Sequence, residues 1–463
     1  MKPSYALLII GSGPAGMAAA CEAASRGVDV CVIDDQPYAG GQIYRNVTAA
    51  TDKQYRVLGP EYQHGNKLVK KFLAYGGEYY PAASVWHIDG TNQVGVIHAG
   101  RTYFIEPENL VIATGAQERP MPIPGWQLPG VMYAGAGQIL LKASGLTPAG
   151  GLILAGSGPL LLLLASQYIK AGVEIKAILD TTPKGRITQH LGKLFAGLRG
   201  YEYLIKGAGL LRQIKAAGIP YYKYVKGLHA GGTDKLEGVA FDSATRGLKQ
   251  VINISFAAEH LLLHQGIIPN TRLSEAAECE LVWNQQQACW NVNTDTVGLC
   301  RDNTYVIGDG ASIKGAISSQ IQGRLCGLHV ACELGKIEQA EWVQGRRSLV
   351  KEMQKHLSIR PFLDCVYAPL DEYLAPDSSQ TIVCRCEEVT VNDIEQAIEL
   401  GCYGPNQIKS FTRCGMGLCQ SAQCSTTLSH IVAKQTKVPI DEVGKLRVRT
   451  PVAPITLGQI AKL

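Results

Sequence analysis

GSGPAG, residues 11–16, is the stretch that decides the fold of this chain. An apolar run at 5–10 predicts a strand before it, residues 17–26 predict a helix after it, and 28–33 predict a second strand. The spacing G-x-G-x-x-G allows a tight turn, close approach of the backbone to a pyrophosphate, and close packing of helix on strand. The unit therefore predicts a dinucleotide site, with contacts from Gly11, Gly13, Pro14, Ala15, Gly16 and the ribose-binding acid Asp34.

Two later stretches resemble the flavoproteins that have two dinucleotide-binding domains. VIATGA, residues 111–116, is an apolar strand that ends in a small-residue turn, and TYVIGD, residues 304–309, ends in Gly-Asp. In that class the first turn marks the exit from an FAD domain and the second marks the return to it. The resemblance implies FAD, and a helix over 315–325 aimed at the isoalloxazine. With GGQIYR at 40–45, it implies further cofactor contacts from Gly41, Gln42, Thr114, Gly115, Gly308 and Asp309.

The first pattern returns at residues 152–180 with one departure. Gly156 and Gly158 take the first two positions and Asp180 the place of the acid, but Leu161 replaces the third glycine. A leucine there pushes the helix from the strand and crowds the pyrophosphate. Three interpretations stay open for this second unit: a scaffold, a site for another nucleotide such as ATP, or an NAD(P) site.

Composition and charge limit the number of domains, the partners and the cellular location that we expect. The chain has 463 residues, too many for one ordinary core, and a net charge of +5, far from a basic nucleic-acid-binding footprint. PLLLLLA, residues 159–165, is too short to cross a bilayer and predicts a buried helix. Residues 1–4 lead directly into the first strand, without the pattern of a signal peptide. We therefore expect a cytoplasmic protein, no nucleic-acid partner, and peripheral membrane association at most.

Cysteines cluster near the C-terminus, where a metal site is expected. The chain has 14 cysteines, and the pattern C-x-C at 384–386 is followed by C-x₄-C. Four soft thiolates suit an iron–sulfur cluster, and zinc is the alternative. The even spacing of Cys414 allows a second C-x₄-C pair, so spacing alone leaves its role open. Glycines around Met416 favour a cluster-binding loop, and the expected ligands are Cys384, Cys386, Cys419 and Cys424.

Local signals place these cysteines between predicted helices. Thr390 is expected to cap a helix that runs to about residue 400, with Asp393 at the capping-box position. Disulfide reductases of the flavoprotein class need C-x₂-C or two cysteines soon after the ribose acid. This chain has neither, which argues against a thiol–disulfide exchange enzyme.

CRCEEVT at 384–390 and RCGMGLCQSAQC at 413–424 resemble the BFD-like [2Fe-2S] module. Together with GSGPAGMAAA, GGQIYR and ATGAQERPMPIPGW, they resemble the α subunits of heteromeric amino-acid and opine dehydrogenases. Those include the A subunits of opine oxidases, the α subunits of D-hydroxyproline and proline dehydrogenases, and the B subunits of hydrogen cyanide synthases. The four expected ligands match the module, whereas Cys414 stands where these relatives usually carry a small non-ligand residue.

The resemblance implies a fold class and a set of boundaries. We expect an α/β two-dinucleotide-binding-domain flavoprotein, in which a Rossmann-like FAD domain holds an inserted second Rossmann-like domain, followed by a small helical BFD-like [2Fe-2S] domain. The expected ranges are 1–145 and 290–365 for the FAD domain, 146–289 for the second domain, 366–380 for a linker, 381–435 for the BFD-like domain and 436–463 for a C-terminal tail.

The resemblance also implies a division of labour. An amino-acid-oxidase-like β subunit would oxidise the amine, and this chain would relay electrons through FAD and the cluster to a quinone or other acceptor. That acceptor would also account for any association with the inner face of the membrane. A second nucleotide, NAD(P) or ATP, or an FMN at the subunit interface is a further expectation. The isolated positions of the histidines agree with a relay, because they give no acid–base constellation, and the catalytic residues stay unknown.

Alternative functions remain at this point. One is that of the B subunit of hydrogen cyanide synthase, which acts in glycine oxidation. Another is a stand-alone NAD(P)H:acceptor oxidoreductase that uses Asp180 as a ribose clamp, and Leu161 argues against it. A third is a cluster-carrying sensor or scaffold without catalytic turnover.

Overall fold

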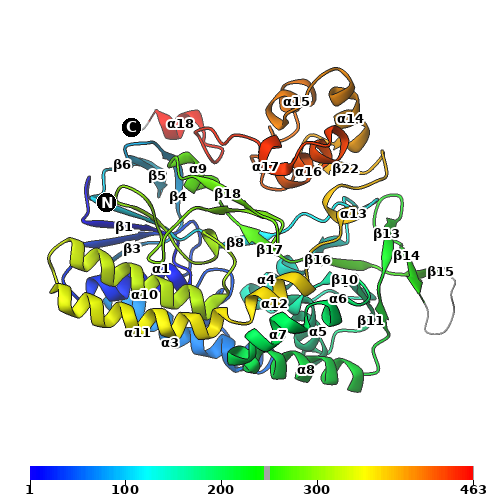
Figure 1. Ribbon diagram of the computed structural model, residues 1–463, viewed down its shortest axis with the longest axis horizontal. Helices are drawn as coiled ribbons and strands as arrows, with labels where there is room; N and C mark the ends of the chain where they lie inside the picture. The colour runs from blue at the N-terminus through cyan, green and yellow to red at the C-terminus, as the bar shows by residue number, and fades with distance from the viewer. Residues whose placement is uncertain (245–250, 462–463) are drawn as a thin grey trace.

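The structure is a computed structural model that describes residues 1–244 and 251–461. Two units built on parallel sheets carry a helical C-terminal unit, drawn in orange and red in Figure 1. Residues 245–250 of the expected second domain and 462–463 of the expected tail lie outside the described residues.

The first unit is centred on a six-stranded sheet in the order β20-β21-β7-β1-β2-β3. Its strands are parallel except for the edge strand β20, which is antiparallel to β21. The central strands are short, continuous apolar runs because both faces of the sheet are covered. Their bounds are β1 (Leu7–Ile10), β2 (Val30–Ile33), β3 (Glu78–Tyr80), β7 (Asn109–Ile112), β20 (Leu299–Arg301) and β21 (Thr304–Val306).

Helices cover one face of this sheet and a small antiparallel sheet covers the other. The two central helices touch through small residues, since a Cβ added to Gly323 would lie 2.1 Å from the carbonyl oxygen of Ala15. The helices are α1 (Pro14–Ala24), α2 (Asp52–Leu58), α3 (Pro60–Tyr75), α10 (Ala316–Glu333) and α11 (Gln339–Leu357). The covering sheet contains β4 (Ala83–Ile88), β5 (Val94–His98) and β6 (Arg101–Ile105).

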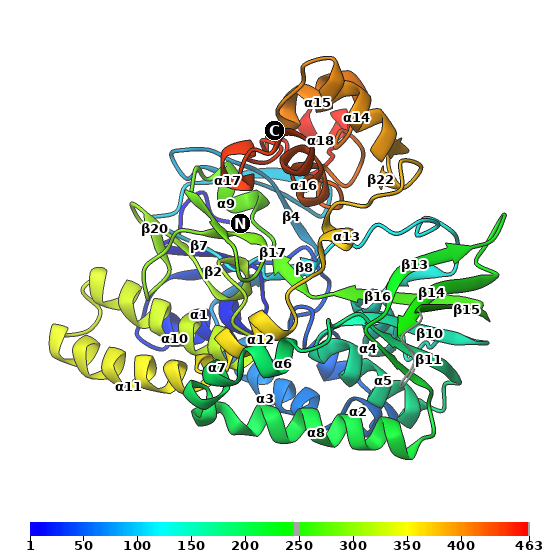
Figure 2. The same ribbon diagram turned by 45° about the vertical axis from the view of Figure 1, so that its right-hand side comes forward.

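The second unit has a parallel sheet in the order β12-β11-β10-β16-β9 and an antiparallel sheet β13-β14-β15, which Figure 2 shows side by side. The parallel strands are β9 (Val131–Tyr133), β10 (Leu152–Ser157), β11 (Ile175–Asp180), β12 (Tyr221–Lys223) and β16 (His260–Gln265). The others are β13 (Lys226–Gly231), β14 (Gly238–Ala244) and β15 (Val251–Ala257). Longer helices are α4 (Ala134–Ser144), α5 (Pro159–Ala171) and α8 (Tyr201–Ala216). Because β9 pairs with β16, residues 131–144 join this unit ahead of the expected boundary at residue 146.

Short elements connect the two sheet units. β8 (Ala116–Glu118) pairs antiparallel with β17 (Ile267–Pro269), and α9 (Arg272–Ala276) follows directly. A hairpin of β18 (Leu281–Asn284) and β19 (Cys289–Val292) comes next. The expected linker 366–380 follows α12 (Arg360–Val366) and contains the short helix α13 (Asp371–Leu374), whose Tyr373 is buried against the second unit.

The C-terminal unit is helical, with its own small core. The hairpin β22 (Ile382–Cys384) and β23 (Val389–Thr390) leads into α14 (Val391–Glu399), α15 (Pro405–Thr412), α16 (Ser425–Thr436) and α17 (Ile440–Val443). The Thr390–Asp393 capping box is present, as expected. The chain then returns to the first unit, where α18 (Leu457–Ile460) packs beside β6.

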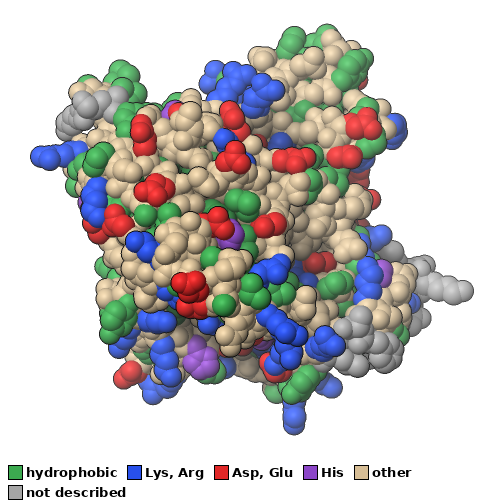
Figure 3. Space-filling model, turned by 60° about the vertical axis from the view of Figure 1, so that its left-hand side comes forward, with side chains coloured by type: hydrophobic (Ala, Val, Ile, Leu, Met, Phe, Trp, Pro, Cys, Tyr) green, Lys and Arg blue, Asp and Glu red, His purple; other side chains and the backbone are tan. Residues whose placement is uncertain are grey.

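The surface carries both signs of charge. On the face seen in Figure 3, acidic and basic side chains lie interspersed over most of the area. Within residues 1–244 and 251–461, no helix combines the length and apolar character that a membrane crossing requires.

Candidate functional site

The three glycines of the first turn have different neighbours. A Cβ added to Gly16 would lie 1.9 Å from the Gly11 carbonyl oxygen, and one added to Gly11, whose φ is +107°, would lie 2.4 Å from the carbonyl oxygen of Ala113. Both glycines are therefore needed for the packing of the turn itself. A Cβ on Gly13 would meet only the Cα of Gly41, at 3.9 Å. A side chain at Gly13 would thus make only one ordinary contact, and Gly13 is the glycine at which a close approach of a ligand to the backbone is expected.

A second glycine loop borders this turn. Gly40 donates a backbone hydrogen bond to the carbonyl oxygen of Ser12 at 2.9 Å, and a Cβ on Gly41 would lie 2.8 Å from the Cα of Gly13. The carbonyl oxygen of Gln42 accepts a hydrogen bond from the buried ammonium of Lys142 at 3.1 Å. Burial lowers the pKa of Lys142 to about 7, with Arg45 acting in the same direction.

Asp34 follows the end of β2, and its carboxylate reaches the same turn. One oxygen, Oδ2, accepts from the Ser12 backbone N–H at 2.5 Å and from Ser12 Oγ at 2.7 Å, while Oδ1 accepts from the backbone N–H of Gln36 at 2.8 Å. Burial raises the pKa of Asp34, and these hydrogen bonds oppose the shift. The ribose-binding role of Asp34 stays a prediction.

The segments around Thr114 and Asp309 meet the glycine turn at one end of the first sheet. A Cβ added to Gly308 would lie 2.8 Å from the Cβ of Ala15, and one added to Gly310 would lie 3.2 Å from Oγ1 of Thr114. The carboxylate of Asp309 accepts from the backbone N–H groups of residues 314 and 315, at 2.7 and 2.8 Å. Segments far apart in sequence thus converge beside the glycine turn.

These residues fit a dinucleotide cofactor such as FAD. The first turn of α1 begins at Pro14 and its N-cap Gly13 offers no side chain, so a phosphate could approach the backbone N–H groups at the start of the helix. Asp34 and Asp309 supply carboxylates near this turn. The cofactor-binding roles of these residues stay predictions.

The second glycine turn differs from the first. Strand β10 continues through Gly156 and Ser157, which pair with His264 and Gln265 of β16, so the turn starts later than in the first unit. Leu161 is buried in α5. The carboxylate of Asp180 is already engaged, since Oδ2 accepts from the hydroxyl of Tyr221 at 2.9 Å and Oδ1 from a backbone N–H at the same distance. The expected ribose acid therefore has a protein partner here.

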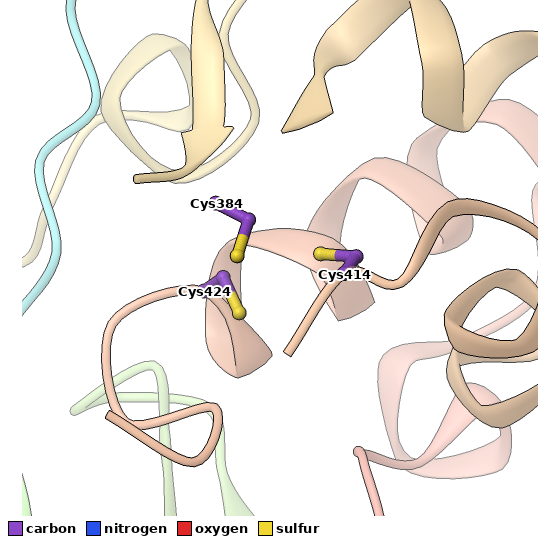
Figure 4. Close-up of side chains that lie close together, drawn as sticks. All are labelled: Cys384, Cys414 and Cys424. Carbon is purple, nitrogen blue, oxygen red and sulfur yellow. The ribbon is translucent and has the colours of Figure 1, made fainter. Parts of the chain in front are cut away.

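Three of the C-terminal cysteines bring their sulfur atoms together. Cys384 ends β22, Cys414 follows α15, and Cys424 is the N-cap residue of α16. The three Sγ atoms lie within 4.8 Å of one another, in a buried position, and point toward a common centre (Figure 4). Hydrogen bonds from the other two thiols hold the pKa of Cys384 well below its ordinary value, and the pKa values of Cys414 and Cys424 are raised.

Cys386 and Cys419 form a neighbouring pair. Cys386 is exposed on the hairpin, and its Sγ lies 3.1 Å from the position of a Cβ added to Gly417. Burial raises the pKa of the Cys419 thiol, and a hydrogen bond with Cys386 adds to this shift. The expected ligand set thus divides into Cys384 with Cys424 and Cys386 with Cys419, while Cys414 joins the first group.

This donor set fits a [2Fe-2S] cluster, because two pairs of thiolates can serve two irons. The grouping of Cys384, Cys414 and Cys424 is also compatible with the zinc alternative, since zinc accepts thiolates as well. The ligand roles of the four expected cysteines remain predictions.

Polar contacts dock the C-terminal unit on the rest of the chain. Arg272 of α9 donates to the carbonyl oxygen of Cys419 at 3.1 Å, and Gln117 of β8 donates to the carbonyl oxygen of Ala422 at 2.8 Å. Trp126 donates from its indole N–H to the carbonyl oxygen of Ile382 at 2.7 Å. Sequence reasoning missed these contacts, because each joins residues more than a hundred positions apart and has no local pattern.

One histidine has a partner that the sequence does not reveal. Nδ1 of His264 lies 2.8 Å from Oε2 of Glu118, and Oε1 of the same carboxylate accepts from the backbone N–H of Gly135. His264 is buried in β16, next to the second glycine turn. This contact ties β8, β16 and the start of α4 together, where the two sheet units meet.

Comparisons with known proteins agree with this geometry. A family model described as pyridine nucleotide-disulphide oxidoreductase matches residues 5–340, and one described as the sarcosine oxidase A3 domain matches residues 378–462. The A subunit of opine oxidase from Rhizobium meliloti is 42% identical over 475 residues, covering 100% of this chain and 88% of the relative. Hydrogen cyanide synthase subunit HcnB of Pseudomonas aeruginosa is 31% identical, covering 98% of both chains.

A solved structure shares the fold over almost the whole chain. L-proline dehydrogenase from P. horikoshii aligns with a TM-score of 0.69 at 18% identity, covering 99% of this chain and 79% of that chain. With the first family model, this likeness confirms the expected two-domain flavoprotein fold class, followed by a helical C-terminal region. The C-terminal match is to the sarcosine oxidase model, and the BFD-like assignment remains a prediction.

Proposed function

The chain belongs to the pyridine nucleotide-disulphide oxidoreductase family, as an α subunit of the opine oxidase type, and on that premise we propose that it is the electron-transfer subunit of a heteromeric dehydrogenase. The donor would be an amino acid or secondary amine of the opine, D-hydroxyproline or proline class. The identity of 42% to the A subunit of an opine oxidase, against 31% to a cyanide synthase subunit, favours the opine type.

FAD would lie against the backbone at Gly13. The first turn of α1 would hold the pyrophosphate through its backbone N–H groups, and Asp34 would accept from the ribose. Asp309 would hold the ribityl-pyrophosphate arm. Bound there, FAD would supply two-electron acceptance. The protein would orient it by the rigid packing of Gly11 against Ala113 and of Gly308 against Ala15.

Cys384, Cys386, Cys419 and Cys424 would hold a [2Fe-2S] cluster, which supplies one-electron transfer. The backbone N–H groups at the start of α16 lie next to Cys424 and would offset part of the thiolate charge. The contact of Arg272 with the Cys419 carbonyl would fix the ligand loop relative to the sheet units. This fixed placement is what an electron relay requires.

The partner would be an amino-acid-oxidase-like β subunit that carries the substrate site. The names of the relatives support this proposal, since they are designated subunits of opine oxidase and of hydrogen cyanide synthase. The acceptor would be a quinone or another carrier. A second nucleotide in the unit 146–289, or FMN at the subunit interface, is part of the proposal without an assigned site.

The observation that carries the proposal is the presence, in one chain, of a tightly packed glycine turn with a buried acid beside it and of a C-terminal cysteine cluster whose loop is held by direct contacts with the sheet units. The test is to purify the chain with and without its partner under anaerobic conditions. We expect an added opine or proline-class amine to bleach the flavin only in the complex. Bleaching of the isolated chain by the amine would contradict the division of labour, and bleaching by NADH alone would favour the reductase alternative.

A further inference from the structure

Two cysteines outside the C-terminal cluster lie in direct contact. The Sγ atoms of Cys279 and Cys300 are 2.7 Å apart, although the residues are 21 positions apart in sequence. Cys279 follows α9, and Cys300 lies in β20, the edge strand of the first sheet. Their contact therefore joins the segment behind α9 to that sheet.

Hydrogen bonds fix the chain next to each of the two cysteines. The N–H of Cys279 donates to the carbonyl oxygen of Ser274 at 2.9 Å, which ends the helix. Next to Cys300, the guanidinium of Arg301 donates to the carbonyl oxygen of Ala277 at 2.8 Å. Neither cysteine is on a free loop end, so the pair is arranged before any reaction occurs.

We propose that Cys279 and Cys300 are a redox modification site at which a reversible disulfide ties the segment behind α9 to β20. A disulfide has an S–S length of about 2.05 Å, so bond formation needs the sulfurs to move less than about 1 Å. Reversible disulfides of reduced compartments are typically redox-sensing. The chain has no C-x₂-C pattern, so this pair differs from the redox-active pairs of disulfide reductases.

The two thiols differ in a way that assigns their roles. Cys279 is 6% exposed, whereas Cys300 is partly exposed. The hydrogen bond from Cys279 lowers the pKa of Cys300, and the charge of Arg301 acts in the same direction, whereas the pKa of Cys279 is raised. Cys300 is therefore the nucleophilic thiolate and Cys279 the resolving thiol.

With hydrogen peroxide as the oxidant, the chemistry balances in two steps. The Cys300 thiolate attacks one peroxide oxygen, the O–O bond breaks, and a sulfenic acid and hydroxide form. The Cys279 sulfur then attacks the Cys300 sulfur, and its thiol proton leaves with the sulfenic oxygen as water. The proton released when the Cys300 thiol ionised neutralises the hydroxide. Two thiols and one peroxide give one disulfide and two waters, and a thiol reductant reverses the change.

A disulfide at this position would affect α9, which contacts the C-terminal unit. The helix α9 carries Arg272, which contacts the Cys419 carbonyl, and Glu275, which pairs with Lys445 of the C-terminal unit. A disulfide between Cys279 and Cys300 would close a covalent loop of the residues between them. It would thereby restrain α9. The expected result is a chain that resists thermal unfolding better when oxidised.

The test uses the full-length protein, purified with its cofactors and treated with a small excess of peroxide before thiols are blocked. Proteolytic cleavage on the N-terminal side of Asp295 and Asp302 places Cys300 on a different peptide from Cys279 and Cys289. We expect a cross-linked pair of peptides that dithiothreitol removes. The Cys289→Ser variant is the matched control, because the Cys289 sulfur contacts the Asn291 side chain instead of a second thiol. This variant should keep the cross-link, and Cys279→Ser and Cys300→Ser should lose it.

A melting experiment provides the second measurement. Oxidation should raise the melting temperature of the natural chain by at least ~2 °C relative to Cys300→Ser treated in the same way. The variant is the reference because both proteins suffer the same peroxide damage to cofactors. Persistence of both free thiols after oxidation would overturn the proposal, and so would a cross-link that survives in Cys300→Ser. An equal melting temperature in oxidised and reduced natural chain would overturn the restraint on α9.

Discussion

Arg272 donates a hydrogen bond from its guanidinium to the carbonyl oxygen of Cys419 at 3.1 Å. The arginine belongs to α9, which follows the connection between the two sheet units, and the cysteine belongs to the loop expected to bind the cluster. This contact joins the part of the chain that would hold the flavin to the part that would hold iron. Gln117 and Trp126 reinforce it through the carbonyl oxygens of Ala422 and Ile382.

Replacement of Arg272 by Gln should weaken this connection without removing a ligand. The Cys419 loop would lose a charge-assisted hydrogen bond, of about 1.5–3 kcal/mol, and gain freedom relative to the sheet units. We expect electron transfer from reduced flavin to the cluster to slow several-fold, measured by anaerobic stopped-flow spectroscopy, with iron content unchanged.

The control for this variant is Arg413→Gln. Arg413 is 67% exposed at its side chain and pairs with Glu387 inside the C-terminal unit, so its loss removes the same charge without touching the sheet units. Equal rates in the two variants would argue against a docking role for Arg272.

Gly13 and Gly16 should respond differently to the same substitution. A Cβ at residue 13 meets only the Gly41 Cα at 3.9 Å, so Gly13→Ala should fold normally but reach into the space where FAD is expected. We expect its FAD affinity to fall by about tenfold or more, a loss of at least ~1.4 kcal/mol, in flavin-titration calorimetry.

Gly16→Ala instead places a Cβ 1.9 Å from the Gly11 carbonyl oxygen. That clash should cost ~1–3 kcal/mol of stability and lower the melting temperature even without flavin. A Gly13→Ala protein with unchanged FAD affinity would contradict the placement of the pyrophosphate.

The local signals of the sequence predicted the parts of the structure that depend on near neighbours. The glycine turn at Gly11–Gly16 and the Thr390–Asp393 capping box involve residues a few positions apart, and their geometry follows from spacing. The departure at Leu161 was also visible, although the hydroxyl of Tyr221 that occupies Asp180 was not, because it lies 41 positions away.

The features that depend on tertiary packing could not be predicted from the sequence. Spacing could not settle the place of Cys414, because its position is fixed only when α15 and α16 pack beside the β22 hairpin. The contact between Cys279 and Cys300 was invisible for the same reason, since the two residues come together only when β20 joins its sheet. The expected domain boundaries came from the resemblance to a family. The pairing of β9 with β16 could not be predicted from the sequence, because it forms only when that sheet assembles.

NADH should not reduce the flavin of this protein directly. Leu161 takes the place of the third glycine, which allows close packing of helix on strand, and β10 continues through Gly156 and Ser157, so the second unit does not reproduce the glycine turn of the first. Anaerobic mixing with NADH should leave the flavin absorbance unchanged over seconds, while an amine donor bleaches it in the complex. Fast bleaching by NADH would show that the second unit binds that nucleotide productively.

His430 should make the C-terminal unit sensitive to acid. Its ring packs edge-on against Trp283 at 5.5 Å, and burial lowers its pKa to about 4, with Arg119 adding to the shift. Because the unfolded histidine titrates near ~6.5, the unfolded state binds the extra proton first, and stability falls as the pH drops from about 6.5 toward 4.

The slope of this loss is at most ~1.4 kcal/mol per pH unit. His430→Phe should therefore lose less of its melting temperature between pH 7 and pH 5 than the natural chain. An identical loss in both proteins would show that the acid sensitivity has another source.

The most direct test of the account is spectroscopy of the anaerobically isolated chain, with FAD and iron counted in the same sample. We predict one FAD and two irons per chain, and an EPR signal of a reduced [2Fe-2S] cluster that disappears in Cys419→Ser and persists in Cys414→Ser. A colourless chain without iron would contradict the account, and a signal that survives Cys419→Ser but is lost in Cys414→Ser would show that Cys414 is the ligand in place of Cys419.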